Sequence, residues 1–300
     1  MRLLLTSLFC CVSVFTADAA DAPVQNVVFA TVDSHKLRLN IFLPRNVKRP
    51  PLVVYIHGGG WEKGSYKSCK VQWLTEHGFA VASVGYRLTD KAKFPAQIHD
   101  CKGAIRWLRA HQTEYGYDTT RIGVTGTSAG GYLSLMVGVT NGVKEMEGDV
   151  GGNTDQSSRV DVIVDYYGPA DFVLRSRNQP IKTEGPTSIV HKLLGAPASK
   201  NKELATAASP AFQVKKDAPP LLILHGKKDG TVFPDQAERM AVEYRKAGRD
   251  VTLELIPRGG HGGKAFFTKP YRKKVVDFFK KHLPTARSPA SSAMSARPLP

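Results

Sequence analysis

The sequence is poor in cysteine, with four in 300 residues. Cys10 and Cys11 lie in an N-terminal apolar run, so only Cys69 and Cys101 belong to the body of the chain. These two can form at most one bridge, which excludes a fold held together by several disulfides. Because they fall near the starts of two separate predicted helices, we expect two separate buried side chains rather than a disulfide.

Long apolar runs are also missing. Residues 3–15 are apolar but too short to span a bilayer, and no later stretch is long enough. Met1-Arg2 provides a charged start, and Ala17-Asp18-Ala19 has small residues at the spacing of a signal-peptidase site. The sequence therefore predicts a signal peptide over residues 1–19 and export to the periplasm or the medium, without stable membrane insertion. A buried N-terminal strand is the less favoured alternative.

Acidic residues are scarce. The chain has 42 Lys and Arg against 26 Asp and Glu, a formal net charge of +16. No basic block is interleaved with aromatic residues, so a nucleic-acid partner is not expected. We interpret the excess as a solvated basic surface, which leaves open a preference for acidic polymers or anionic surfaces. The acidic, glycine-rich segment 141–158 lacks a recognisable spacing of oxygen ligands, so we interpret it as a surface loop rather than a cation site.

Apolar runs of strand length alternate with helix-like segments from Leu52 onwards. This alternation predicts an α/β fold, with a mostly parallel central sheet and helices on both faces. Residues 24–43 alternate apolar and polar side chains and predict a hairpin that adds an antiparallel edge. We expect one domain over residues 20–284, a small cap insertion at about 171–217, and a disordered tail over 285–300.

The most informative motif is Gly126-Thr127-Ser128-Ala129-Gly130-Gly131, between a strand-like and a helix-like run. A strand, a glycine-flanked serine and a helix form the context of a nucleophile turn. The small flanking residues allow a sharp turn that leaves the Ser128 hydroxyl over the positive end of the following helix. Taken alone, the motif also fits an ordinary glycine-rich turn, so its partners must decide.

A serine nucleophile needs an adjacent base, which a third group must orient. Loops that follow parallel strands converge at one edge of the sheet. Asp229 follows the strand-like run 221–224, and His261 follows the run 251–256. The order Ser, Asp, His is the one used by this type of nucleophile turn. Ser128, Asp229 and His261 are therefore the predicted catalytic residues; Asp235, the alternative acid, is interpreted as a helix cap.

The run His57-Gly58-Gly59-Gly60-Trp61 follows another buried strand, and its glycines can turn backbone N–H groups toward an oxyanion. The amide of Ala129, directly after the nucleophile, is the second expected source of donors. A flexible surface turn is the alternative for the glycine run. His57, His99 and His225 are interpreted as structural.

With these residues assembled, the chain resembles the α/β-hydrolase esterase superfamily over roughly residues 24–283. It is most similar to hormone-sensitive-lipase-like and BD-FAE-like carboxylesterases, through the motifs above together with Tyr86-Arg87-Leu88 and His225-Gly226-Lys227-Lys228-Asp229. The resemblance implies an oxyanion hole formed by the amides of three residues, Gly59, Gly60 and Ala129.

The same resemblance implies that no metal or organic cofactor is used, and that Arg87 and Asp100 pair beneath the site. Hormone-sensitive-lipase-like enzymes carry a long helical segment before the first strand, and this sequence reaches its first strand early. We therefore expect that only residues 171–217 can cover the site, which would leave an open pocket.

An open pocket favours short-chain or aryl esters, such as acetyl or feruloyl groups on polysaccharides, cleaved through an acyl-enzyme. The expected partner is a small-molecule or polysaccharide-linked ester, and the oligomeric state stays open. One alternative is an arylformamidase-like amide hydrolase, because the His-Gly-Gly-x-Trp pattern fits those enzymes as well. The other is a non-catalytic binding protein with a hydrolase fold.

Overall fold

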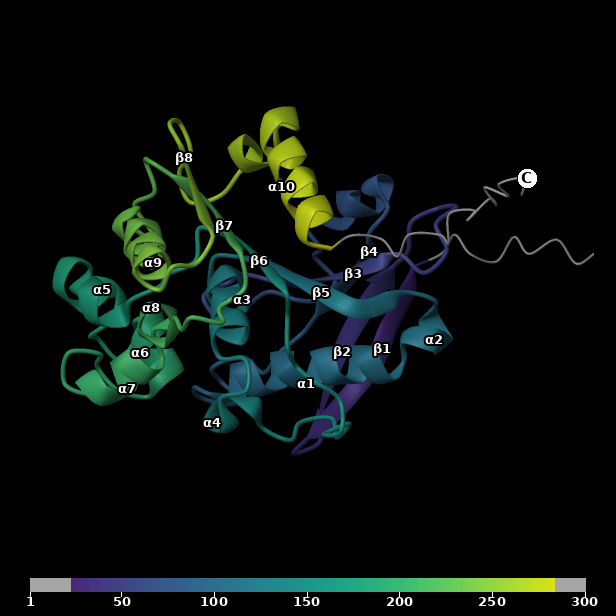
Figure 1. The fold of residues 1–300 in the computed structure, drawn as a ribbon. Helices are drawn as coiled ribbons and strands as arrows, with labels where there is room; N and C mark the ends of the chain where they lie inside the picture. The colour runs from purple at the N-terminus through teal and green to yellow at the C-terminus, as the bar shows by residue number, and fades with distance from the viewer. Residues whose placement is uncertain (1–22, 284–300) are drawn as a thin grey trace, which may run out of the picture.

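The structure, a computed structural model, describes residues 23–283, so the predicted signal peptide and tail lie outside the described residues. One eight-stranded sheet organises the chain, in the order β1-β2-β4-β3-β5-β6-β7-β8 (Figure 1). Its strands are β1 (Val24–Val32), β2 (His35–Phe42), β3 (Pro51–Ile56), β4 (Ala80–Val84), β5 (Asp118–Thr127), β6 (Val162–Tyr166), β7 (Leu221–Gly226) and β8 (Val251–Ile256).

The helices follow the strands in alternation, as predicted. They are α1 (Ala96–Ala110), α2 (Gln112–Tyr115), α3 (Ala129–Val139), α4 (Lys144–Glu147), α5 (Phe172–Asn178), α6 (Ile189–Leu194), α7 (Lys202–Ala207), α8 (Pro210–Gln213), α9 (Asp235–Lys246) and α10 (Lys269–His282). Three short 3-10 turns complete the set: η1 (Gln72–His77), η2 (Pro180–Lys182) and η3 (Lys264–Phe267).

The sheet is parallel from β4 to β8, and the predicted hairpin forms its antiparallel edge. β1 pairs with β2, and β2 pairs with β4, in antiparallel register. The remaining pairs, from β3–β4 to β7–β8, are all parallel. Parallel strands direct their carboxyl ends to the same edge, which brings the loops after β3, β5, β7 and β8 together.

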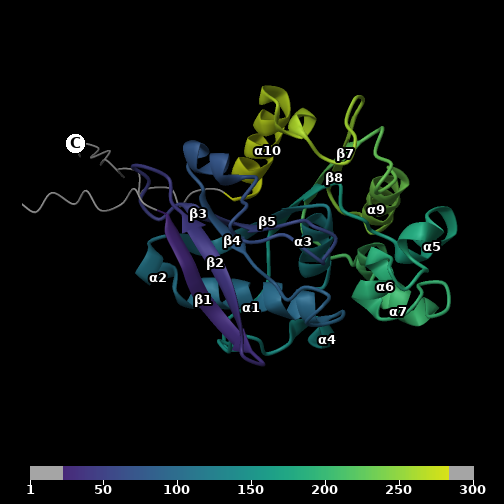
Figure 2. The same cartoon turned by 180° about the vertical axis from the view of Figure 1, so that it is seen from behind.

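Two hydrophobic cores lie on opposite faces of the sheet, and β3 contributes side chains to both. Leu52, Val54 and Ile56 enter the core that includes side chains of α1, α3 and α9. Val53 and Tyr55 enter the core that includes side chains of η1 and α10. Because successive strand residues point to opposite faces, a strand covered on both sides needs a continuous apolar run. Figures 1 and 2 show the helices on both faces.

The insertion 171–217 folds into the short elements α5, η2, α6, α7 and α8, beside α9 in both views (Figures 1 and 2). Asp171, Ser188 and Asn201 each accept a hydrogen bond from a backbone N–H in the first turn of their helix. Such caps satisfy donors that have no partner inside the helix, typically stabilising it by about 1 kcal/mol. These caps therefore allow short helices in a segment with weak periodicity.

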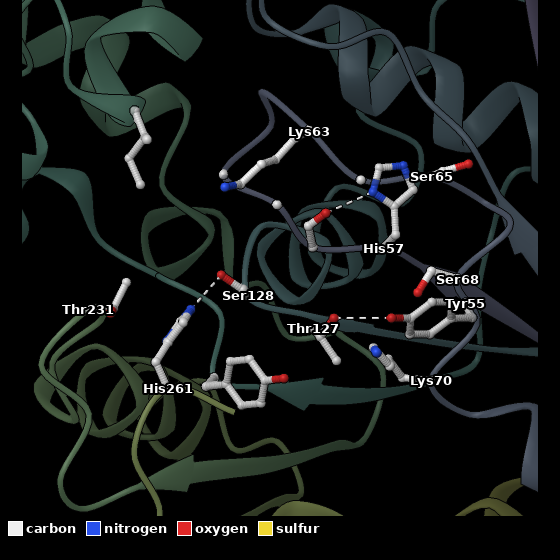
Figure 3. A pocket seen from close by; sticks show the side chains of 16 residues that line it. Tyr55, His57, Lys63, Ser65, Ser68, Lys70, Thr127, Ser128, Thr231 and His261 are labelled. Carbon is white, nitrogen blue, oxygen red and sulfur yellow. Dashed lines mark hydrogen bonds between the residues drawn. The ribbon is translucent and has the colours of Figure 1, made fainter. Parts of the chain in front are cut away.

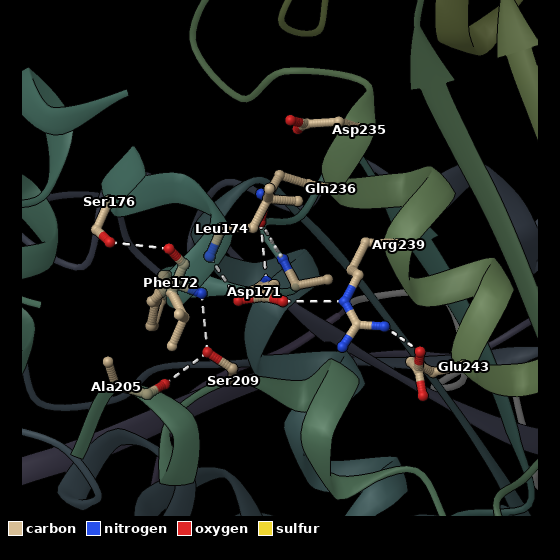
Figure 4. A network of polar contacts seen from close by, with 12 residues as sticks. Asp171, Phe172, Leu174, Ser176, Ala205, Ser209, Asp235, Gln236, Arg239 and Glu243 are labelled. Atoms are coloured by element: carbon tan, nitrogen blue, oxygen red, sulfur yellow. Dashed lines mark hydrogen bonds and ion pairs between the residues drawn. The ribbon is translucent and has the colours of Figure 1, made fainter. Parts of the chain in front are cut away.

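A polar network fastens the start of this insertion to α9 (Figure 4). The Gln236 side-chain oxygen accepts hydrogen bonds from the backbone N–H groups of Ala170 and Asp171, at 3.0 and 2.8 Å. Asp171 also accepts from Arg239 Nε at 3.0 Å. Buried backbone donors must be paired, and these contacts pair them. The insertion is thereby held against the side of the sheet.

The acidic segment 141–158 lies largely at the surface, as predicted, but its residue Glu147 is only partly exposed. It contains α4, whose Glu147 side chain lies 2.6 Å from the Lys102 amino group and 3.5 Å from Arg106. Lys102 is fully buried in α1, so its charge needs a partner inside the protein. The surface-loop interpretation therefore holds for most of the segment. The pairing of Glu147 was not predicted, because the sequence did not show that two cations of α1 face inward.

Cys69 and Cys101 are both free thiols, one half-buried and one buried, which confirms the expectation of two separate side chains. Burial raises the pKa of the Cys69 thiol to about 11.

Within residues 23–283, no helix combines the length and the apolar character needed to cross a membrane.

Candidate active site

Ser128 occupies a strained turn between β5 and α3. Its backbone has φ 55° and ψ −117°, a region that residues other than glycine rarely adopt and that clusters at functional sites. A Cβ at Gly130 would lie 2.0 Å from the Ile56 carbonyl oxygen, so only glycine allows α3 to start this close to β3. The Ser128 N–H donates to the Tyr166 carbonyl at 2.8 Å, which ties the turn to β6.

The three residues predicted as a triad lie in contact, and Figure 3 shows the contact between Ser128 and His261. Ser128 Oγ lies 2.8 Å from His261 Nε2, and His261 Nδ1 lies 2.8 Å from Asp229 Oδ2. In the neutral imidazole, a proton on Nδ1 that is donated to the carboxylate leaves Nε2 as the acceptor for the serine hydroxyl. His261 is 22% exposed and Asp229 is fully buried, so the base meets the solvent and the acid does not.

The Asp229 carboxylate is held by several donors. Oδ1 accepts from the backbone N–H groups of Thr231 and Val232, at 2.8 and 2.9 Å. His225 Nε2 lies 3.3 Å from Oδ2 and donates to the Val232 carbonyl at 2.9 Å. Burial raises the pKa of the Asp229 carboxyl, but hydrogen bonds from His225, His261 and Val232 outweigh it and leave the pKa well below its usual value. Asp229 is therefore ionised at neutral pH.

Asp235, the alternative acid, lies at the start of α9 and accepts a hydrogen bond from Asn178. His99, interpreted as structural, contacts the Glu145 carbonyl at 3.0 Å. His225, also interpreted as structural, instead lies directly behind Asp229. Its position two residues before the Lys227-Lys228-Asp229 stretch is the sequence signal that could have indicated this contact.

The glycine loop after β3 borders the nucleophile. Gly59 and Gly60 line the same cleft as Ser128, and both have positive φ, at 120° and 64°. A Cβ on Gly59 would fall 2.0 Å from the Lys63 carbonyl oxygen, so this turn requires glycine. Ala129 is the first residue of α3, and the first N–H groups of a helix have no partner inside it. Of the three residues predicted for an oxyanion hole, Gly59 and Gly60 thus line the cleft with Ser128, and Ala129 directly follows Ser128.

His57 contacts this glycine loop and packs against Tyr86. Its Nδ1 lies 2.8 Å from the Gly58 carbonyl, and its ring stacks on Tyr86 with centroids 4.4 Å apart. The Tyr86 hydroxyl donates to the His57 carbonyl at 3.0 Å. His57 is only 4% exposed, and burial lowers its pKa to about 4. The ring is therefore neutral at pH 7, which agrees with a structural role.

This burial makes stability depend on pH. Below pH 6.5 the unfolded chain protonates His57 and the folded protein does not, until the pH approaches 4. Between these values, His57 should cost the folded state up to roughly 3 kcal/mol as the pH falls. We expect His57→Gln to lose this dependence, so that the stability difference between wild type and variant shrinks by that amount from pH 7 to pH 4.

Urea unfolding at several pH values measures this difference. Contributions shared by both proteins cancel, and His35→Gln, at the exposed start of β2, is the matched control. A difference between wild type and His57→Gln that did not change with pH would contradict the buried neutral ring.

Asp165 is a buried carboxyl that the sequence reasoning missed. It lies in β6, one strand from Ser128, and its Oδ1 accepts from the Gly168 N–H at 3.0 Å. Its Oδ2 is buried without a partner among the described residues. Burial raises the pKa of this carboxyl to about 7, and the nearby His225 only partly offsets this. An acidic residue inside the apolar run 162–167 was the available signal.

Arg87 and Asp100 pair as the family resemblance implied. Arg87 Nε lies 3.0 and 2.9 Å from the two carboxylate oxygens, and Nη2 lies 2.7 Å from Oδ1. The Arg87 backbone N–H adds a bond of 2.8 Å to Oδ2. Such two-pronged pairs fix geometry as well as charge. The pair ties the segment after β4 to α1.

The cleft above Ser128 has a volume of about 500 Å³. The insertion 171–217 contributes Ile189 to its lining, whereas the loop from 57 to 70 contributes most of one wall. The expectation that only the insertion could cover the site is therefore wrong. The network around Asp171 holds the insertion beside the sheet, which leaves the wall of the cleft to the loop after β3.

Most of the side chains that line the cleft carry a polar group. Hydroxyl groups come from Tyr55, Ser65, Ser68, Thr127, Ser128, Tyr167 and Thr231. Ile189 is the one aliphatic side chain that lines the cleft within the described residues. The same part of the chain contains no group of three or more His, Cys, Asp or Glu side chains arranged to hold a metal ion.

Comparison with known proteins is consistent with this site. The BD-FAE family model matches residues 39–244. Esterase LipC of Mycobacterium tuberculosis is 30% identical over 219 residues, covering 72% of this chain and 53% of the relative. The chain spans about half the length of three curated relatives that it matches, the esterases LipC and LipQ and the probable carboxylic ester hydrolase LipM of Mycobacterium tuberculosis.

Solved structures match over more of their length. A truncated carbohydrate esterase from gut microbiota is 31% identical, with a TM-score of 0.81, and the match covers 90% of this chain and 99% of that one. An acetyl ester-xyloside bifunctional hydrolase from Caldicellulosiruptor lactoaceticus is 26% identical, with a TM-score of 0.70 and coverage of 82% and 88%. These likenesses confirm the predicted α/β-hydrolase fold.

Proposed function

The chain belongs to the BD-FAE family, and on this premise we propose that it is a serine hydrolase of carboxylic esters that removes short or aryl acyl groups from carbohydrates. The observation that carries this proposal is the chain of two 2.8 Å contacts from Ser128 through His261 to Asp229, on the floor of an open cleft. A hydroxyl, a base that accepts its proton and an ionised group that orients the base are what acyl transfer needs.

In the first half of the reaction, Ser128 Oγ attacks the ester carbonyl carbon while its proton passes to His261 Nε2. The oxygen of the tetrahedral intermediate accepts hydrogen bonds from the backbone N–H groups of Gly59, Gly60 and Ala129. The carbon–oxygen bond to the alcohol then breaks, and the alcohol oxygen takes the proton from His261. An acyl group remains on Ser128.

In the second half, His261 takes a proton from a water molecule, whose oxygen attacks the acyl carbon. The intermediate collapses, Ser128 recovers its proton from His261, and the carboxylic acid leaves. Asp229 keeps its negative charge throughout and stabilises the imidazolium that forms twice in each cycle. The low pKa of Asp229 suits this role.

The lining of the cleft supports a short acyl group. A long alkyl chain would cover the hydroxyl groups of the lining and leave some without hydrogen bonds, at a cost of about 1–3 kcal/mol each. Ile189 is the one aliphatic side chain that lines the cleft within the described residues, so a long alkyl chain would gain few aliphatic contacts there. Sugar hydroxyls, by contrast, can pair with the same groups. The matched structures described as a carbohydrate esterase and an acetyl ester-xyloside hydrolase support this choice.

The protein would encounter its ester substrate outside the cytoplasm. The N-terminal pattern of residues 1–19 supports export through a signal peptide, cleaved before Ala20. Expression of the full chain in a bacterium, followed by N-terminal sequencing of the product outside the cytoplasm, tests this. Recovery of an uncleaved chain in the cytoplasm would contradict export.

A substrate panel tests the function. We expect kcat/KM for 4-nitrophenyl esters to fall by about 100-fold or more from acetate to decanoate, because Ile189 is the one aliphatic side chain among the described residues that line the cleft. Acetylated xylan and methyl ferulate test the carbohydrate and aryl assignments. Faster hydrolysis of N-formylkynurenine than of any ester would favour the arylformamidase alternative, and inactivity on the whole panel would favour a binding protein.

A further inference from the structure

The cleft over Ser128 carries an unbalanced positive charge. Lys63 and Lys70 line it, and none of its lining residues is an Asp or Glu. Both lysines are exposed. Neither forms an ion pair with any residue in the described range 23–283, although the adjacent Glu62 pairs with Lys192. Two free ammonium groups therefore face the space that the substrate would occupy.

Each of the two lysines lies next to residues that shape the site. The Lys63 N–H donates to the Gly59 carbonyl at 3.1 Å, so Lys63 belongs to the tight turn of the glycine loop. Lys70 lies beside Tyr55, whose hydroxyl lies 3.1 Å from Thr127 Oγ1, next to the nucleophile. In Figure 3 the Lys63 amino group lies above Ser128, and Lys70 lies on the side of Ser128 away from His261. The charges thus flank the reacting serine.

A positive cleft of this kind attracts and orients an anionic substrate. An ammonium group that forms a charge-assisted hydrogen bond to a carboxylate or sulfate binds it more strongly than a neutral hydroxyl. Solvent exposure weakens each contact. We therefore expect each lysine to raise kcat/KM for an anionic substrate by roughly 3- to 10-fold. The net charge of +16 would also steer acidic polymers toward the protein.

We propose that this cleft selects esters in which the sugar that carries the acyl group also bears a negative charge, as a carboxylate or a sulfate. The inference rests on the proposed function, because acetyl and feruloyl groups carry no carboxylate or sulfate of their own. The charge must then belong to the alcohol part of the ester. A uronic acid unit or a sulfated sugar unit within a polysaccharide has this chemistry.

Two substrates that differ only at C6, where one has a carboxylate and the other a hydroxymethyl group, test the proposal. The first is an acetylated methyl glucuronoside, and the second is the methyl glucoside acetylated at the same hydroxyl. At low salt we expect wild type to prefer the glucuronoside by about 10-fold or more in kcat/KM, mainly through a lower KM. The preference should decrease as salt is added, because the charges are exposed.

Variants assign the preference to the two lysines. Lys63→Gln and Lys70→Gln should each lower the ratio between the two substrates, and the double variant should bring it close to one. Lys67→Gln is the matched control, since Lys67 lies in the same loop but does not line the cleft. It should keep the wild-type ratio. A third substrate is the methyl glucoside acetylated at the same hydroxyl and sulfated at C6. It determines whether a sulfate can replace the carboxylate.

The outcomes separate the two levels of the proposal. If neither sugar acetate nor 4-nitrophenyl acetate is hydrolysed, the proposed function fails. If both sugar acetates are hydrolysed with equal kcat/KM, the function stands and the charge selection is overturned. A preference that survives in the double variant would also overturn it, because other groups would then recognise the charge.

Discussion

Ser128→Ala is expected to lower kcat for 4-nitrophenyl acetate by about a million-fold, to the level left by binding and backbone donors alone. The hydroxyl that would form the acyl-enzyme is removed, and His261 then has no proton to accept from the chain. The backbone should tolerate the change, since alanine has the same Cβ as serine at this strained position. Steady-state kinetics, with circular dichroism to confirm folding, measure the effect.

Ser68→Ala is the matched control, because Ser68 lines the same cleft at a distance from the triad. We expect its kcat to change by less than about 10-fold, since it can only lose a substrate hydrogen bond. A folded Ser128→Ala protein with near wild-type kcat would show that another residue is the nucleophile. Labelling of wild type, but not of the variant, by a fluorophosphonate provides an independent readout.

Asp229→Asn has the second largest expected effect, a loss of about 10,000-fold in kcat. The side-chain oxygen of the new amide would accept from the Thr231 and Val232 N–H groups, as Asp229 Oδ1 does now, which turns the amide NH₂ toward His261. The ring would then carry its proton on Nε2 and could no longer accept the proton of Ser128. KM should change little, because Asp229 is fully buried and does not line the cleft.

Asp235→Asn is the control for this prediction, because Asp235 follows the same strand and was the alternative acid. Asp235 lies at the start of α9, away from His261, and its side chain contacts Asn178 of α5. We expect kcat within a few-fold of wild type. Loss of activity in Asp235→Asn, with activity retained in Asp229→Asn, would reverse the assignment of the acid.

Much of the site could be predicted from sequence because its parts are set locally. The turn at Ser128 needs glycines on both sides, and a strand and a helix around it; all of these are visible in the sequence. Parallel strands place their carboxyl ends at one edge, so the chain order of Ser128, Asp229 and His261 already indicated their meeting. The alternation of strands and helices predicted the α/β layering, and the resemblance carried by the motifs implied the α/β-hydrolase fold.

The tertiary structure alone decided which side chains face each other across elements distant in sequence. It placed His225 behind Asp229, and Glu147 against the buried Lys102. It also made the loop from 57 to 70, with Lys63 and Lys70, the main wall of the cleft in place of the insertion. Local sterics and periodicity specify turns, strands and helices. The lining and charge of a cleft depend on how separate loops pack, and no local pattern in the sequence contains that information.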